Sequence, residues 1–265
     1  MHIRKERNEM NPICRVCEQK TDFFGEAVIL KKYNIKYFKC KNCGSIQTEK
    51  PYWLDEAYSD AIVDEDIGLA GRNYDLAHKV QAILKLCYSN KTKTHLDYGG
   101  GYGLFTRLMR DAGFDFERYD KYCPNLFAKH FDKKRDHYDV VTAFELLEHL
   151  PNPVEDIGKM MELGDIVIVS TLLLPVPEPQ PNDWWYYVLD GGQHITFYTE
   201  KSMRVIAEHY NRHYYGVGTV HIFSRSKISQ LKLKIALRFS RLVTKLIKRT
   251  GLLASDYKLI TGKEL

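Results

Sequence analysis

The sequence predicts an α/β protein in which helices cover both faces of a mostly parallel sheet, preceded by a small metal-binding module. Two observations predict the sheet: apolar strands alternate with helices along residues 94–171, and the first strand runs into a glycine-rich turn. The module is predicted by four cysteines that form two CxxC pairs within residues 12–48. We therefore expect three parts, namely a metal ribbon with its linker at 1–53, the α/β domain at 54–225, and a basic helix and tail at 226–265.

The paired cysteines indicate a metal site, because a chain without a secretory signal keeps its thiols reduced. Four thiolates on two tight turns suit tetrahedral zinc, and a module of about 40 residues lacks the apolar core to fold without such a crosslink. Four cysteines leave no open position for water, so the zinc is expected to be structural, and iron is the chemical alternative. The expected ligands are Cys14, Cys17, Cys40 and Cys43.

The spacing of apolar residues predicts the elements of the α/β domain in order. Residues 54–73 are expected to be irregular and acidic, and helices are predicted at Tyr74–Tyr88, Gly103–Ala112, Val154–Leu163 and Thr199–Tyr210. Buried strands are predicted at Thr94–Tyr98, Phe116–Asp120, Tyr138–Phe144 and Asp165–Thr171. A closing antiparallel pair is predicted at Tyr214–Val217 and Thr219–Phe223.

The strongest functional signal is THLDYGGGYGLF, residues 94–105, where a strand passes through a glycine turn into a helix. Such a turn lets a ligand approach the backbone without interference from Cβ atoms. A second acid, Asp120, ends the following strand, where a carboxylate can accept hydrogen bonds from both hydroxyls of a ribose. The candidate binding residues of this region are Asp97, Tyr98, Gly99, Gly101, Gly103, Asp120 and Lys121.

Together with this turn, the segment YDVVTAFELLEHLPNP at 138–153 resembles class I, Rossmann-like methyltransferases, nearest the ubiquinone-biosynthesis branch. The resemblance implies S-adenosylmethionine as cofactor, with the methionine over the glycine turn and the ribose on Asp120. It also implies that Phe144 and Glu145 lie beside the methionine and the sulfonium. Only 18 residues separate Asp120 from Asp139, so the region of the third strand is expected to be shortened, with Asn125, Leu126 and Phe127 as candidates for the adenine pocket.

The ribbon and a late G-Q-H-x-x-F-Y-T motif at 192–199 resemble methyltransferases of bacterial surface-polysaccharide gene clusters. That resemblance implies a hydroxyl of a sugar or glycan as the acceptor. His149 and His194 are the candidate bases, because histidine titrates near neutral pH, and Glu145 or Glu148 is placed to orient them. Catalysis by alignment alone stays open, and so do purely structural roles for both histidines.

The sequence disfavours two other functions. A nucleic-acid methyltransferase is disfavoured because the strand at 138–144 continues into F-E-L-L instead of D/N-P-P-Y/F, and because the ribbon lacks a dense basic face. We therefore expect no nucleic-acid partner. An inactive binding scaffold is disfavoured by the intact glycine turn and Asp120.

The basic tail is the last feature. Eight basic residues and no acidic one lie between Lys227 and Gly251, although the net charge of the chain is only +5. On a helix an apolar stripe would face either the inner surface of an anionic membrane, the protein's own sheet, or a second subunit in a homodimer. No apolar run is long enough for a membrane span and MHIRKERNEM has no apolar core, so a cytoplasmic location is expected. The stripe consists of Ile228, Leu231, Ile235, Leu242 and Leu246.

Overall fold

A computed structural model describes residues 11–58, 67–89 and 91–265. The sequence-based expectations for MHIRKERNEM and for residues 59–66 of the irregular acidic segment lie outside these described residues. In the described part of that segment the expectation is wrong, because Leu54–Ala57 forms the short helix α1 and the helix expected from Tyr74 already begins at Leu69. None of the helices that the structure describes is both long and apolar enough to cross a lipid bilayer.

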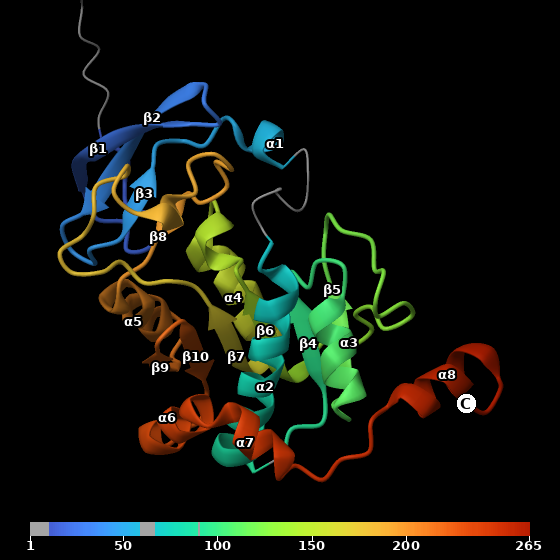
Figure 1. Cartoon of the computed structure of the whole chain (residues 1–265). Coiled ribbons are helices and arrows are strands. Elements are labelled where there is room, and N and C mark those ends of the chain that lie inside the picture. Colours follow the sequence, from blue (N-terminus) through green and yellow to red (C-terminus); the bar gives the residue numbers. More distant parts are fainter. Residues whose placement is uncertain (1–10, 59–66, 90) are drawn as a thin grey trace, which may run out of the picture.

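The larger of two sheets has six strands in the order β5-β4-β6-β7-β10-β9 (Figure 1). The first four are mutually parallel, whereas β10 is antiparallel to both β7 and β9. This arrangement confirms the mostly parallel, Rossmann-like sheet with its closing antiparallel pair. The bounds are β4 His95–Tyr98, β5 Phe116–Tyr119, β6 Tyr138–Phe144, β7 Gly164–Ser170, β9 His213–Val217 and β10 Val220–Ser224.

Helices cover both faces of this sheet because its central strands are apolar on both sides. Val140 of β6 packs into the core beneath α2 (Leu69–Tyr88) and α3 (Leu104–Asp111). Its neighbour Val141 packs into the opposite core, beneath α4 (Pro153–Leu163) and α5 (Glu200–His209). Successive side chains of a strand point to opposite faces, so a continuous apolar run is what a sheet buried on both faces requires.

The expected shortening next to β5 is confirmed. Residues 120–137 add no strand or helix to the sheet, apart from one isolated parallel bridge between Arg118 and Asp132. The side chain of Arg118 fixes this segment, since Nη1 lies 2.9 Å from Asp132 Oδ1 and Nε donates to the carbonyl of Gly101 at 2.6 Å. An irregular loop therefore stands where a complete sheet of this type would continue.

The cysteine module forms the second sheet, in the order β1-β2-β3-β8. The fourth strand comes from far along the chain, inside the part expected at 54–225, and it pairs antiparallel with β3. Trp53, in the linker before α1 (Leu54–Ala57), is almost fully buried and donates from Nε1 to the carbonyl of Gly192 at 2.7 Å. The ribbon is thus built into the α/β domain. Its strands are β1 Thr21–Ile29, β2 Tyr33–Cys40, β3 Ile46–Thr48 and β8 Thr196–Phe197.

The basic tail differs from the single helix that its sequence predicts. It forms α6 (Gln230–Arg238), α7 (Ser240–Lys245) and α8 (Leu253–Thr261), with a break between the first two at Phe239. Leu233, Ala236 and Val243 are buried in the core that includes α2, whereas most of the expected stripe is exposed. The helix face that packs on the protein is therefore a different one from the face that periodicity picks out.

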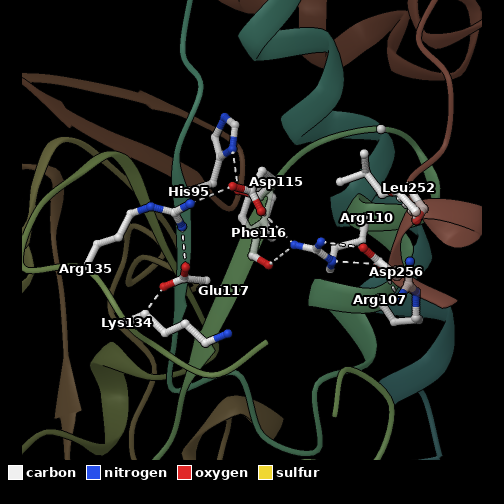
Figure 2. A network of polar contacts seen from close by, with 12 residues as sticks. His95, Arg107, Arg110, Asp115, Phe116, Glu117, Lys134, Arg135, Leu252 and Asp256 are labelled. Atoms are coloured by element: carbon white, nitrogen blue, oxygen red, sulfur yellow. Dashed lines mark hydrogen bonds and ion pairs between the residues drawn. The ribbon is translucent and has the colours of Figure 1, made fainter. Parts of the chain in front are cut away.

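Buried ion pairs attach α8 to the α/β domain (Figure 2). Asp256 of α8 accepts from Arg110 of α3 at 2.6 and 2.9 Å and from Arg107 at 2.9 Å. The side chains of Asp256 and Arg110 are both about 5% exposed. Arg110 also contacts Asp115 at 2.7 Å, and Arg135 joins Asp115 to Glu117, so the network continues into β5.

Candidate functional site

The carboxyl ends of the parallel strands bring the predicted binding residues to one edge of the sheet. The glycine turn follows β4, Asp120 follows β5 and Glu145 follows β6. Ligands of open α/β sheets bind at this edge, because the strand-to-helix loops and the helix N-termini converge there.

Asp120 is held against the glycine turn by the backbone. The amide of Gly101 donates to its Oδ2 at 2.9 Å, and the amides of Tyr122 and Cys123 donate to its Oδ1 at 2.8 Å. Gly101 has a φ of +53°, and a Cβ added there would meet nothing within 4 Å, so this side of the turn is open. A half-buried carboxylate therefore stands beside an open stretch of backbone, as a ribose next to the turn would require.

Asp97 lies beneath the turn. Its carboxylate is fully buried and accepts hydrogen bonds from Thr142 at 3.0 Å and Thr106 at 3.2 Å. Burial raises the pKa of Asp97 to about 7, although the two threonine hydrogen bonds oppose the shift. These bonds join β4 to β6 and α3, so the structure gives Asp97 a positioning role under the turn.

The other candidates for the cofactor surround the turn with aromatic surface. The rings of Tyr98 and Tyr119 lie 5.0 Å apart, and Phe144 packs edge-on against Phe105 at 4.8 Å. Lys121 is exposed, with Nζ 5.2 Å from the ring of Tyr122.

The loop with the candidates for adenine binding is hydrogen-bonded to the glycine turn. The amides of Leu126 and Phe127 both donate to the carbonyl of Tyr102 within the glycine turn. Asn125 accepts from the amide of Ala128 at 3.0 Å and donates to Asp132 at 3.1 Å. Leu126 and Phe127 keep about half of their surface exposed, so their apolar side chains are available beside the turn.

Glu145 occupies a strained position directly after β6. Its φ of +49° is left-handed, which is costly for a residue with a side chain and is typical of functional sites. Ser170 at the end of β7 donates to Glu145 Oε1 at 2.6 Å and accepts from its amide at 3.0 Å. Burial raises the pKa of Glu145, and the neighbouring Glu148 raises it further.

His149 and His194 meet although they come from separate loops. Their rings lie 4.8 Å apart in an edge-to-face contact. His194 Nδ1 is 2.7 Å from the carbonyl of Tyr186, so this nitrogen carries the proton and Nε2 is left with a lone pair. His149 Nδ1 is 3.0 Å from the hydroxyl of Tyr58. The short helix Leu147–His149 after β6 therefore brings one candidate base to the other.

Glu148 completes this cluster. Its side chain is fully buried, and Oε1 accepts from the hydroxyl of Tyr186 at 2.7 Å and lies 3.9 Å from His194 Nε2. Oε2 has no hydrogen-bond partner among the residues that the structure describes. Ligand atoms of Glu148, His149 and His194 lie within 4.8 Å of one another, a spacing that also suits a divalent cation. Sequence reasoning named Glu148 only as a helper and missed Tyr58 and Tyr186, since hydrogen bonding across such separations leaves no local signal.

Both histidines are neutral near pH 7. Burial lowers the pKa of His194 to about 4, with the Tyr186 carbonyl and Glu145 acting in the opposite direction. Burial also lowers the pKa of His149, and the neighbouring His194 lowers it further. A neutral imidazole accepts a proton, so the arrangement can support deprotonation of a hydroxyl at His194 Nε2.

The aromatic run at 184–187 is mostly packed inward. Trp184, Tyr186 and Tyr187 belong to the core that joins the ribbon to the domain. Trp185 alone of the four is largely exposed, at 73%. Stacking on an acceptor is therefore open to Trp185, whereas the other three rings serve the fold.

The four paired cysteines converge as the sequence predicts. Sγ atoms of Cys14 and Cys43 lie 3.6 Å apart, those of Cys17 and Cys40 lie 3.4 Å apart, and all four fall within 4.8 Å of one another. Sulfurs bound tetrahedrally to one zinc are about 3.8 Å apart, so the cluster fits that ion. Hydrogen bonds from Cys43 and Ser45 lower the pKa of the Cys14 thiol, against the effect of burial, so the cluster favours a thiolate at this position.

A class I, Rossmann-like methyltransferase is defined by the strand order, the glycine turn after β4 and the acids that follow β5 and β6. The family described as "Methyltransferase domain" matches residues 69–212, which is more than half of the chain. The chain therefore belongs to this methyltransferase family.

Curated relatives agree with this assignment. The chain is 41% identical to a ubiquinone biosynthesis O-methyltransferase of Shewanella halifaxensis, over 30% of this chain and 44% of the relative. It is 30% identical to the protein of the same description from Shewanella pealeana, over 34% of this chain and 50% of the relative. The chain thus spans about half the length of the curated relatives that it matches.

Solved methyltransferase structures also align with the chain. An O-methyltransferase family protein from Burkholderia thailandensis aligns with a TM-score of 0.49 and 14% identity, over 68% of this chain and 64% of that one. The magnesium protoporphyrin IX methyltransferase from Synechocystis aligns with a TM-score of 0.42 and 14% identity, over 64% and 90%.

Proposed function

We propose that this protein transfers a methyl group from S-adenosylmethionine to a hydroxyl of a small molecule. Membership of the methyltransferase family supports the reaction class, and the curated relatives are described as O-methyltransferases. The observation that carries the proposal is the neutral His194, whose unprotonated Nε2 lies beside the buried Glu148 near the loop that follows β6.

The residues at the strand ends fit the cofactor. Asp120 would hold the ribose hydroxyls, the open turn around Gly101 would accommodate the methionine, and Phe144 and Glu145 would lie beside the methyl group. Leu126 and Phe127 would supply apolar contact for adenine. They lie in the irregular loop that replaces the strand expected after β5. When bound, S-adenosylmethionine supplies a methyl group on a sulfonium, activated for in-line displacement.

The chain's own part is to orient the acceptor and to take its proton. His194 Nε2 would accept the proton that the acceptor hydroxyl loses on methylation. Its imidazole is held in position by the Tyr186 carbonyl, and the nearby Glu148 carboxylate stabilises the imidazolium that forms. The ring of His149 packs edge-to-face against the ring of His194 and thereby excludes water from it.

For the acceptor we propose a sugar or glycan hydroxyl. Trp185 supports this, because its exposed ring belongs to the residue directly before Tyr186, whose carbonyl holds His194. A flat indole face can stack on sugar C–H groups.

For the cysteine cluster we propose one structural zinc ion. Cys14, Cys17, Cys40 and Cys43 would hold it, and the mutual spacing of their sulfurs supports the assignment. The ion would crosslink the two turns that precede β1 and follow β2.

The test is to incubate the purified protein with S-adenosylmethionine and a panel of small-molecule hydroxyl acceptors that includes sugar nucleotides. Formation of S-adenosylhomocysteine that depends on an acceptor, with one added methyl group in the product by mass spectrometry, is the expected result. Binding of S-adenosylmethionine without methylation of any hydroxyl acceptor, or methylation of RNA instead, would contradict the proposal.

A further inference from the structure

The outer face of α6 and α7 exposes five large apolar side chains that the proposed methyl transfer does not use. They are between 40% and 69% exposed and recur every three or four residues, so they form one stripe along both helices. The opposite face of the same helices already packs on the protein through Leu233, Ala236 and Val243. The stripe, named here the tail stripe, consists of Leu231, Ile235, Phe239, Leu242 and Leu246.

Cations flank the tail stripe. No acidic residue lies between Lys227 and Gly251. Within the part of the chain that the structure describes, the flanking cations are exposed and none forms an ion pair, although ion pairs are common elsewhere in the molecule. These cations are Lys227, Lys232, Lys234, Arg238, Arg241, Lys245 and Lys248.

The fold fixes how this face is presented. The hydroxyl of Thr244 in α7 lies 3.0 Å from Nδ1 of His78 in α2, and the amide of Ile228, just before α6, donates to the hydroxyl of Tyr215 at 3.0 Å. Both ends of the segment are thereby attached to the domain, with the inner side chains buried between them. The tail stripe and its cations form a preformed surface, which needs no unfolding to become accessible.

We propose that this surface docks the protein on an anionic phospholipid membrane. The tail stripe enters the boundary between headgroups and acyl chains, and the flanking lysines and arginines bind the lipid phosphates. Apolar residues between cations are what an interfacial helix requires, because burial of the stripe and attraction to anionic lipid act together. The association is peripheral, since none of the described helices can cross a bilayer.

Two other occupants fit the surface less well. A symmetric dimer through this face would place the same patch of each copy against the other, so about seven cations of each copy would repel one another. A nucleic acid would neutralise the cations, but it would leave five large apolar side chains without a partner. An anionic membrane matches both the charge and the apolar stripe.

The experiment is flotation of the full chain with vesicles of phosphatidylcholine alone or of phosphatidylcholine with phosphatidylglycerol. We expect the protein to float with the mixed vesicles, to stay at the bottom with the neutral ones, and to be released by high salt. Absence of flotation with mixed vesicles at low salt overturns the proposal. Equal binding to both kinds of vesicle overturns the part assigned to the cations.

Matched variants locate the surface. Reversing three tail cations should weaken binding roughly tenfold or more, because each reversal replaces attraction to anionic lipid by repulsion. Replacing three stripe residues by serine should also abolish flotation, and light scattering should show a monomer in both cases. The variants are Lys234→Glu with Arg238→Glu and Lys245→Glu, and Leu231→Ser with Leu242→Ser and Leu246→Ser.

The control makes the same change of charge at exposed lysines elsewhere, and thermal melting confirms that every variant is folded. The control should float as the wild type does, and an equal loss in the control overturns the assignment to this face. A wild-type dimer that the serine variant abolishes, without flotation of either protein, shows a subunit interface instead. The control is Lys20→Glu with Lys91→Glu and Lys129→Glu.

Discussion

Asp120 binds the backbone amides of Gly101, Tyr122 and Cys123 with its two oxygens, so its carboxylate is in place before any ligand arrives. We expect Asp120→Asn to weaken binding of S-adenosylmethionine by about 1–3 kcal/mol, since a charged acceptor for two ribose hydroxyls is lost. Isothermal titration calorimetry measures this difference. The control is Asp136→Asn, at an exposed position of the same loop, and equal affinities of the two variants would count against the ribose assignment.

His194 is the residue on which the proposed chemistry depends. His194→Ala should lower turnover by roughly 10²–10⁴-fold and leave the affinity for S-adenosylmethionine unchanged, because the acceptor proton loses its base. The exposed His209→Ala serves as the control. Steady-state rates with a fixed acceptor measure the effect. Full activity of the His194 variant, together with full activity of His149→Ala, would show that alignment of the reactants is sufficient.

Asp97 predicts a pH dependence of stability. Its folded pKa is raised to about 7 from an ordinary value of 3.8, so between these pH values the folded state binds more protons at this site than the unfolded state does. Its contribution is therefore fully present below about pH 4 and is lost as pH rises toward 7, by up to about 1.4 kcal/mol per pH unit. Asp97→Asn removes the titrating group. Urea unfolding at several pH values should show the wild type losing stability relative to this variant as pH rises, and parallel curves would disprove the assignment.

At the scale of elements, the ion pairs in Figure 2 hold α8 to α3. Asp256→Ala should destabilise the protein by about 3 kcal/mol, because Nε and Nη2 of the buried Arg110 lose their acceptor and only Asp115 remains as its counter-charge. Asp111→Ala is the control, since Asp111 is nearly half exposed and its bond to Arg107 at 2.8 Å is a surface pair worth at most about 1 kcal/mol. Chemical denaturation measures both. Equal effects would mean that α8 contributes little to the fold.

The elements that could be predicted from the sequence are those with a local pattern of apolar residues or of chain length. The apolar run at 138–144 and the shortened loop after Asp120 were both confirmed, because burial on both faces and chain length each leave a local pattern. The strand β8 has two residues, and its pairing with β3 depends on contacts about 150 positions away. In the tail, periodicity singled out a stripe of large apolar side chains. The face that packs against α2 is instead the one with Leu233, Ala236 and Val243.

The same limit applies to the candidate site. The glycine turn, Asp120 and the two histidines were found because each belongs to a short motif. No short motif indicates that the Tyr186 carbonyl fixes the tautomer of His194, or that the Tyr186 hydroxyl donates to the buried Glu148. Such assignments need three-dimensional distances, since Tyr186 and Glu148 are 38 positions apart in the sequence.

At the scale of the whole molecule, the cysteine cluster and the candidate site are mechanically connected. Arg15, between two of the cysteines, donates to the carbonyl of Ile195 at 2.8 Å and to that of Glu49 at 2.8 Å. Ile195 directly follows His194, and its amide donates to the carbonyl of Glu148 at 2.9 Å. Thr199, the N-cap of α5, donates to the carbonyl of Cys43 at 2.6 Å. The segment with His194 is thus held on one side by the ribbon and on the other by the helix that begins at Leu147.

This connection predicts that the metal affects catalysis without touching substrate. Cys43→Ser should lose the zinc, because one of four thiolates is removed, and elemental analysis should fall from about one zinc per chain to well below that. Turnover should fall roughly tenfold to hundredfold as the His194 segment loosens, since small displacements of a catalytic group are costly. Binding of S-adenosylmethionine should change little, because Asp120 and the glycine turn follow strands of the other sheet and Asp120 is held by amides of its own loop and of the turn. Cys87→Ser, at an isolated half-buried cysteine, should keep both the zinc and the activity. A Cys43 variant that lost zinc but kept full turnover would show that the ribbon serves some purpose other than holding His194.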